Sequence, residues 1–231
     1  HLFNAGANLI DIGGESTRPG SKIVKESLEW SRISKILKLL IKKKIPLSLD
    51  TRKSNIMKKG IDLGVQLIND VSGLNFDINT IDVLKKYKVP FVIQHSQGIP
   101  ENMQQNPTYK NELLDIYDFF EKKIRLIRSR GIKHNNIILD PGIGFGKNLK
   151  HNMSLICNIS IFHSLGFPIL VGNSRKRFIK ELSKKNDSKS RIGGTMASSI
   201  YLMMQGVQIL RVHDVNEVMQ GLNVFKKIIN N

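Results

Sequence analysis

The chain has 231 residues, a length that fits one domain with a sizeable hydrophobic core, and it has one cysteine, Cys157. A single cysteine excludes an internal disulfide and suits a reducing compartment. The best candidate for a membrane span, residues 33–47, is interrupted by lysines, and no signal peptide is visible at the start. We therefore expect a single cytoplasmic domain over residues 1–231, with no membrane span.

The formal net charge is +17, with 36 lysines and arginines against 19 acidic residues. Such an excess can indicate nucleic acid or another polyanion as a partner. Here the lysines are spread along the whole chain, without an arginine-rich arm and without interleaved aromatic residues. We therefore expect no nucleic-acid partner, and we assign the charge to the attraction of anionic substrates.

Short apolar runs alternate with helical patterns along the chain. The runs, which we predict to be strands, lie at residues 8–12, 47–50, 66–70, 90–95, 137–139, 169–172 and 208–212. Predicted helices lie at residues 27–44, from 54 to about 60 or 64, at 78–87, 112–130, from 152 onward, from 174 onward, at 192–205 and at 215–229. Residues 1–6 are typical of the last turn of a helix, with Gly6 as its C-terminal cap.

Polar residues stand at or just after the end of almost every predicted strand. They are Thr17, Asp50, Asn69, His95, Asp140, Lys176, Arg211 and His213. Alternating strands and helices predict parallel strands with helical crossovers, and a barrel gathers the strand ends on one face, where its active site lies. We therefore predict an α/β fold, a TIM (β/α)8 barrel whose first strand is missing from this chain. An open doubly wound sheet is the alternative.

A glycine-rich loop follows the apolar run at residues 137–139. The run ends in Asp140 and Pro141, and glycines alternate over residues 142–146. The loop is not a Walker A loop, because Pro141 stands where the first glycine is needed and Asn148 replaces Ser or Thr. The spacing also excludes the dinucleotide fingerprint. The loop either lets the backbone approach a ligand closely or simply connects a strand to a helix.

The strand-end residues suggest two kinds of ligand. Carboxylates at Asp50 and Asp140 can each accept parallel N–H bonds from a 2-amino-pyrimidinone ring, and an amide and a lysine can complete its recognition. Arg211 and His213 lie two residues apart on a strand and point the same way. Together with the loop that carries Thr17, they are suited to phosphate or pyrophosphate.

Seven motifs occur in a fixed order along the chain. They are Asp-Ile-Gly-Gly-Glu-Ser-Thr-Arg-Pro-Gly (11–20), Leu-Ser-Leu-Asp-Thr (47–51), Ile-Asn-Asp (68–70), His-Ser-Gln-Gly (95–98), Leu-Asp-Pro-Gly-Ile-Gly-Phe-Gly-Lys (139–147), Gly-Asn-Ser-Arg-Lys (172–176) and Arg-Val-His-Asp (211–214). This ordered set resembles the dihydropteroate synthases, the sulfonamide targets of folate biosynthesis. The resemblance implies a TIM-barrel transferase in which p-aminobenzoate displaces pyrophosphate from (7,8-dihydropterin-6-yl)methyl diphosphate to give 7,8-dihydropteroate.

The resemblance also implies roles for individual residues. The expected pterin contacts are Asp50, Asn69, Asp140 and Lys176. The expected diphosphate contacts are Thr17, Arg211 and His213, and the expected p-aminobenzoate contacts are Thr17, Arg18, Pro19, Phe145 and Lys176. Within this set the catalytic residues are expected to be Lys176, Arg211 and His213. Mg²⁺ is the implied cofactor, with its ligand in a loop that precedes His1, and a homodimer is the implied assembly.

Several residues have an alternative interpretation. Asp50 and Asp140 can instead cap the helices that follow them, and His95 is as well suited to a structural hydrogen bond as to a substrate contact. Asp11 and Asp70 are expected to support the site or to cap helices rather than to bind substrate. Three further histidines, expected on the surface, are His134, His151 and His163.

The sequence departs from the family pattern at three positions near the expected site. Gln94 and Ser96 flank His95 where methionines are common, and Arg177 stands where serine is common. Two other functions remain alternatives: a pterin-binding barrel that transfers a methyl group, and a non-catalytic barrel that binds polyanions.

We expect the chain His1–Asn231 to be inactive alone. A closed barrel pairs its first and last strands. Without an upstream strand, the strands at residues 8–12 and 208–212 each leave backbone groups unpaired, at roughly 1–3 kcal/mol for each group buried dry. Comparing the activity and unfolding of this chain with a form extended upstream tests the expectation. Full activity and two-state unfolding of the shorter form would contradict it.

Overall fold

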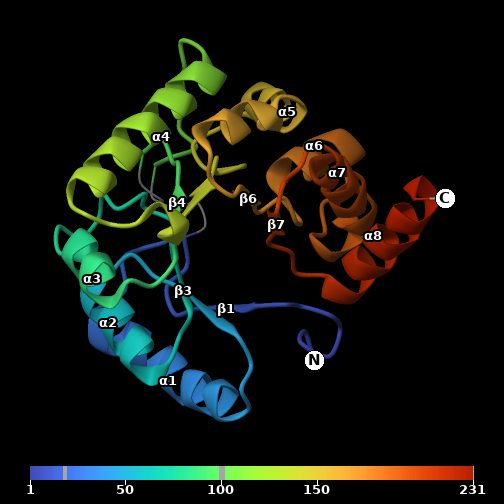
Figure 1. The fold of residues 1–231 in the computed structure, drawn as a ribbon. Coiled ribbons are helices and arrows are strands. Elements are labelled where there is room, and N and C mark those ends of the chain that lie inside the picture. The colour runs from blue at the N-terminus through green and yellow to red at the C-terminus, as the bar shows by residue number, and fades with distance from the viewer. Residues whose placement is uncertain (18–19, 99–101, 231) are drawn as a thin grey trace.

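The computed structural model describes residues 1–17, 20–98 and 102–230. In these residues strands alternate with helices that lie around their outside (Figure 1). The strands are β1 (Ile10–Gly13), β2 (Leu47–Asp50), β3 (Leu67–Asp70), β4 (Phe91–Gln94), β5 (Ile137–Asp140), β6 (Leu170–Val171) and β7 (Ile209–Leu210). The α-helices are α1 (Glu26–Lys42), α2 (Ser54–Leu63), α3 (Thr80–Tyr87), α4 (Glu112–Ser129), α5 (Leu149–Cys157), α6 (Arg177–Ser183), α7 (Ile192–Met204) and α8 (Val215–Ile229).

The strands are parallel and follow one another in chain order. Strands β1 to β5 form one sheet, β6 pairs with β7, and a bridge between Leu139 and Ile169 continues the order from β5 toward β6. This consecutive order is that of a TIM barrel, as predicted, because a doubly wound sheet reverses its strand order part-way. Within the described residues, no strand pairing joins β1 to β7.

Two apolar layers fix which way each strand faces. The outer layer, between strands and helices, includes Leu49, Ile68, Ile93 and Leu139, all fully buried. The inner layer gathers Leu67, Val92 and Leu170 with the partly buried Leu9, Ile138 and Ile209.

Polar residues lie next to this inner layer, on the side of the carboxyl ends of the strands. Because side chains alternate along a strand, residues two positions beyond the inner layer face the same side. Those residues are Asp11, Asn69, Gln94, Asp140 and Arg211. The alternation therefore carries polar groups to the carboxyl ends of five different strands, above an apolar floor.

The helices begin and end where local chemistry dictates. The carbonyl oxygen of the Asn111 side chain accepts hydrogen bonds from the N–H groups of Leu113 and Leu114, both at 3.1 Å, and so caps α4. The helix is followed by Gly131 at φ +83°, a left-handed conformation that glycine adopts without strain. No helix in the described part of the chain is long and apolar enough to cross a membrane.

Three predicted boundaries need correction. Residues 1–6 form hydrogen-bonded turns rather than the end of a helix, although Gly6 has the expected positive φ of +103°. Helix α5 begins at Leu149 rather than at residue 152, because Asn148 caps it by accepting from the N–H of His151 at 2.9 Å. Helix α6 begins at Arg177, since the left-handed φ of +58° at Arg175 interrupts the helix predicted from residue 174.

We predict that Gly142→Ala destabilises the fold by roughly 2–4 kcal/mol. Gly142 has φ +70°, and an added Cβ would lie 1.9 Å from the carbonyl oxygen of His95, so the backbone would have to shift. Gly166→Ala is the matched control, because its φ is +82° and the nearest atom to its added Cβ is 3.8 Å away. Urea unfolding should show a loss of only about 1 kcal/mol for the control. Equal losses would contradict the clash.

Candidate active site

Arg211 brings the ends of three strands together at the top of the barrel. Its Nε lies 2.6 Å from Oδ2 of Asp11, and its Nη2 lies 3.2 Å from Oδ2 of Asp50. The amide of Asn69 donates to the same Asp11 oxygen at 3.3 Å. Asp11, which the sequence suggested as a supporting residue, therefore lies at the centre of this cluster and not at its edge.

The cluster contains buried polar atoms that lack a partner in the described residues. They are Oδ1 of Asp11, Oδ1 of Asn69 and, on the neighbouring strand, Nε2 of Gln94. A buried polar atom without a partner costs about 1–3 kcal/mol, so a fold retains such atoms where a ligand can satisfy them. The inner face of the barrel therefore presents both donors and acceptors to a polar ligand.

The carboxyl groups of the cluster are electrostatically perturbed. Burial raises the pKa of Asp50 to about 8, Asp11 adds to this shift, and Arg211 opposes it. Burial also raises the pKa of Asp140. The Gly142 N–H, which donates to Asp140 Oδ1 at 2.8 Å, acts in the opposite direction and lowers this pKa. Carboxyl groups whose pKa is raised by burial and by specific charged neighbours are typical of binding and catalytic sites.

Lys176 lies between the glycine-rich loop and these carboxyl groups. Its Nζ is 4.2 Å from the centre of the Phe145 ring, and its side chain packs on Gly144, where an added Cβ would lie 3.2 Å from Cδ. Burial lowers the pKa of Lys176 to about 8, although Asp140 opposes the shift. Lys176 and Phe145, two residues predicted to border the same pocket, thus lie side by side.

Lys147, which the sequence analysis did not single out, anchors the other side of the loop. It is only 2% exposed, and its Nζ lies 3.0 Å from Nδ1 of His95 and 2.9 Å from the carbonyl oxygen of Phe145. Burial, reinforced by Lys147, lowers the pKa of His95 to about 2, so the ring is neutral. Of the two interpretations of His95, the geometry favours the structural hydrogen bond.

Arg211 and His213 contact different groups, although they lie two residues apart. The Nδ1 of His213 lies 3.1 Å from the hydroxyl oxygen of Ser174, and the His213 N–H donates to the same oxygen at 3.3 Å. Beside them the Nε of Arg175 donates to Oδ2 of Asp214 at 2.9 Å. Burial and Arg175 lower the pKa of His213, which favours the neutral ring.

Comparison with known proteins decides the family. The sequence matches the pterin binding enzymes over residues 1–213. It is 34% identical to the dihydropteroate synthase of Escherichia coli K12 over 99% of this chain and 81% of that protein. It is 36% identical to the Synechocystis dihydropteroate synthase over 95% of this chain and 76% of that protein. The chain belongs to the dihydropteroate synthase family.

Solved structures of this family have the same fold. The Yersinia pestis dihydropteroate synthase in a sulfonamide drug complex matches with a TM-score of 0.94 at 38% identity, over 99% of this chain and 82% of that one. The Xanthomonas albilineans enzyme with 4-aminobenzoic acid gives 0.94 at 33% identity, over 100% of this chain and 82% of that one. The family, the fold and the enzyme class predicted from the seven motifs are therefore confirmed.

Other predicted residues of the family site have mixed placements. Thr17 is half-buried, while Arg18 and Pro19 lie outside the described residues. Gln94 is buried, and Arg177 forms an exposed ion pair with Glu181 at 2.6 Å. Arg177, which stands where serine is common in the family, therefore pairs with a residue of its own helix.

The remaining candidates have local roles. Asp70 accepts bonds from the N–H and the hydroxyl of Ser72 at 2.8 and 2.6 Å, and burial raises its pKa to about 6. Neither Asp50 nor Asp140 caps the next helix; the side chain that accepts from the first N–H of α2 is Asp77, at 2.8 Å.

The three other histidines, which are exposed or half-buried, bond to nearby backbone; they are His134, His151 and His163.

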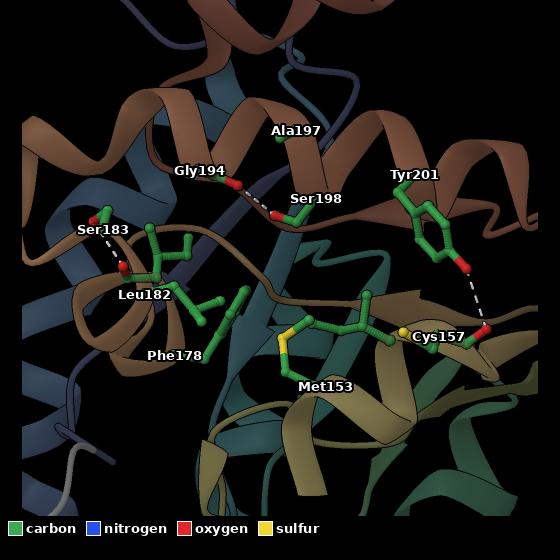
Figure 2. A pocket seen from close by; sticks show the side chains of 11 residues that line it. Met153, Cys157, Phe178, Leu182, Ser183, Gly194, Ala197, Ser198 and Tyr201 are labelled. Atoms are coloured by element: carbon green, nitrogen blue, oxygen red, sulfur yellow. Dashed lines mark hydrogen bonds between the residues drawn. The ribbon is translucent and has the colours of Figure 1, made fainter. Parts of the chain in front are cut away.

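An apolar cavity of about 350 Å³ lies between α5, α6 and α7 (Figure 2). Its walls include Met153, Phe178 and Tyr201, and the Tyr201 hydroxyl donates to the carbonyl oxygen of Cys157 at 3.3 Å. None of the predicted substrate residues lines it. We assign the active site to the strand-end cluster instead, because that cluster holds the charged and hydrogen-bonding groups that the chemistry requires.

We predict that Asp140→Asn weakens pterin binding by roughly 2–4 kcal/mol, because one carboxylate oxygen becomes a donor facing a donor. Calorimetric titration with a pterin measures the change. Asp70→Asn is the matched control, since Asp70 is also buried at a strand end but bonds to Ser72. Its pterin affinity should stay within about twofold of the parent. An equal affinity in Asp140→Asn would remove Asp140 from the site.

Lys176→Ala should impair turnover more than stability. Because the folded pKa of about 8 lies below the ordinary 10.5, the charged form costs stability below pH 8, and this cost disappears as the pH rises through 8 toward 10.5. In the parent, kcat/KM should fall above about pH 8 as Lys176 loses its proton. The variant should lack this alkaline limb. A sharp fall in Tm with normal activity would indicate a structural lysine.

Proposed function

We propose that this protein condenses p-aminobenzoate with (7,8-dihydropterin-6-yl)methyl diphosphate, forming 7,8-dihydropteroate and pyrophosphate. The observation that carries the proposal is the hydrogen-bonded cluster of Asp11, Asp50, Asn69 and Arg211, with unpartnered buried polar atoms at the strand ends. Its relatives are dihydropteroate synthases, and one solved relative holds 4-aminobenzoic acid.

The pterin ring fits the polar groups above the inner apolar layer. Asp140 accepts the paired N–H groups of the 2-amino-pyrimidinone edge, and Asn69 offers both a donor and an acceptor. Lys176 supplies a charged donor from the opposite side, beside Phe145. Asp50, whose pKa is raised to about 8, can accept a hydrogen bond when ionised and donate one when protonated.

In the reaction, the amine nitrogen of p-aminobenzoate forms a bond to the exocyclic methylene carbon of the pterin. The bond from that carbon to the diphosphate oxygen breaks, its electron pair leaves with pyrophosphate, and the amine loses a proton. Positive charge that develops on the carbon is favoured by neighbouring carboxyl groups in their ionised form, Asp140 and, once the pH reaches its pKa of about 8, Asp50. Positioning and electrostatics therefore supply the catalysis.

The leaving diphosphate is proposed to meet Arg211, His213 and Thr17. Arg211 has five N–H donors, and its contacts with Asp11 and Asp50 use Nε and Nη2, so Nη1 remains for a phosphate oxygen. The side chain of Arg211 is 44% exposed, which leaves it accessible from solvent. The aromatic acid is proposed to lie beside Phe145 and Lys176, with Arg18 and Pro19 as the further predicted contacts.

Magnesium stays a predicted cofactor. Among the described residues, no group of three or more His, Cys, Asp or Glu is placed to hold a metal ion. Mg²⁺ is often held by substrate phosphates and only one or two carboxylates. Chelation with EDTA, followed by return of Mg²⁺, tests whether the activity depends on the metal.

The substrate assay tests the function directly. The form extended upstream is incubated with both substrates, and dihydropteroate is measured by mass spectrometry beside pyrophosphate release. Equal amounts of the two products are expected, and a sulfonamide should compete with p-aminobenzoate. Pterin binding without product would favour the methyl-transfer barrel, and binding of random DNA alone would favour the polyanion-binding barrel.

The assembly and location are also proposals. We propose a cytoplasmic homodimer, a prediction that came from the family resemblance and from the single cysteine. Large apolar side chains are exposed on α7 and α8, among them Met204 and Ile228 at 64% and 67% exposure. Sedimentation of the purified protein measures the oligomeric state.

A further inference from the structure

A second group of buried charges lies outside the barrel, against α1, and the proposed reaction does not use it. We name it the Glu15 cluster, and its members are Glu15, Glu29, Thr51, Arg52 and Lys53. They come from the loop after β1, from α1 and from the loop after β2. The cluster thus joins the loop that carries Thr17 to the loop that directly follows Asp50, both of them predicted substrate residues.

Glu15 has bonds to three different groups. Its Oε2 accepts from Nε of Arg52 at 2.8 Å, and its Oε1 accepts from Nζ of Lys53 at 2.9 Å and from the N–H of Val24 at 2.7 Å. Burial raises the pKa of Glu15, but these hydrogen bonds outweigh burial and hold the pKa below its ordinary value. The carboxylate therefore stays ionised at neutral pH.

Glu29 occupies the other side of the cluster and does not touch the loop after β1 through its carboxylate. Its Oε2 accepts from Nζ of Lys53 at 2.5 Å, and its Oε1 accepts from the hydroxyl of Thr51 at 2.6 Å. The guanidinium of Arg52 lies 4.1 Å above the Phe76 ring. Two carboxylates and two cations are therefore fully paired in a buried space.

The bond to Val24 ties together the two ends of a loop. Glu15 precedes residues 16–23 and Val24 follows them, so one carboxylate oxygen closes this segment at its base. The start of the loop is fixed again by Arg32, whose Nη1 donates to the carbonyl oxygen of Gly14 at 2.8 Å. Thr17 lies only two residues beyond Glu15, within the closed segment.

Stability alone is a poor reason to bury these charges. Desolvation of an ion pair often equals or exceeds the attraction between its members, and well-packed apolar residues frequently do as well. A buried network of this kind does, however, specify one geometry for the segments that it joins. Here those segments are the base of the loop that carries Thr17 and the loop after β2.

We propose that Glu15 is a positioning residue for the p-aminobenzoate side of the active site. Its carboxylate, held by Arg52 and Lys53 and bonded to the N–H of Val24, sets the base of the loop so that Thr17 meets the aromatic acid. The role rests on the proposed function. It is distinct from the pterin contacts, because none of the hydrogen bonds described for the side chains of the Glu15 cluster reaches the side chain of Asp140 or Asn69. The Thr51 N–H donates to the backbone carbonyl oxygen of Asn69 at 3.2 Å, a bond that does not involve the Asn69 amide.

The test compares Glu15→Gln with Glu29→Gln. Each variant removes one buried charge that pairs with Lys53, but only Glu15→Gln disturbs the base of the loop. The KM for p-aminobenzoate should rise about tenfold in Glu15→Gln, with pterin affinity within about twofold of the parent. Glu29→Gln should lower Tm yet keep the KM for p-aminobenzoate. Trypsin cleavage after the exposed Lys22 should accelerate only in Glu15→Gln.

Equal KM values in the two variants, whether raised or unchanged, would overturn the proposal. If Glu15→Gln does not fold, Arg32→Gln tests the same anchoring from an exposed position, and an unchanged KM there would also overturn it. Inactivity of both this chain and the form extended upstream would instead refute the proposed function. In that case the trypsin comparison still decides whether Glu15 fixes the loop.

Discussion

The ion pairs of Arg211 with Asp11 and Asp50 connect the last described strand to the first two. They span 200 and 161 residues of sequence, and they lie where the described residues show no strand pairing between β7 and β1. A parallel barrel depends on bringing its two ends together. Here charged side chains make the connection at the carboxyl ends of the strands, and the same side chains form the centre of the proposed active site. The charged bridge therefore places Asp11 and Asp50 above the inner apolar layer.

The two buried charge clusters differ in how well their atoms are paired. In the Glu15 cluster every carboxylate oxygen has a hydrogen-bond donor within the protein. In the strand-end cluster, Asp11 and Asn69 each keep a buried oxygen without one. Complete pairing is expected where charges hold segments in place, and incomplete pairing is expected where a ligand completes the set. The contrast separates the part of the fold that holds the loops from the part that binds.

Local patterns were sufficient to predict the barrel and the family. The positions of Asp140 and Asn69 at the ends of apolar runs placed them on one face of the barrel, and the ordered motifs identified the pterin-binding enzymes. The central position of Asp11 and the pairing of Lys147 with His95, 52 residues away, depend on contacts between distant segments, which no local pattern contains. Helix starts were also missed, because capping by Asn148 is a side-chain geometry rather than a periodicity.

Phe145, the aromatic residue between two glycines of the glycine-rich loop, is held by two lysines. Lys147 donates to the carbonyl oxygen of Phe145 at 2.9 Å, while Lys176 lies over the Phe145 ring at 4.2 Å. The N–H of Gly144 donates to the side chain of Asn152 at 2.7 Å, which fixes the loop one residue earlier. Phe145 is thus held through its backbone from one side and through its ring from the other. Because Lys176 also interacts with Asp140, the ring of Phe145 and the carboxyl group of Asp140 share one cation. A single lysine therefore links the aromatic ring of the loop to Asp140, the carboxyl group proposed to bind the pterin.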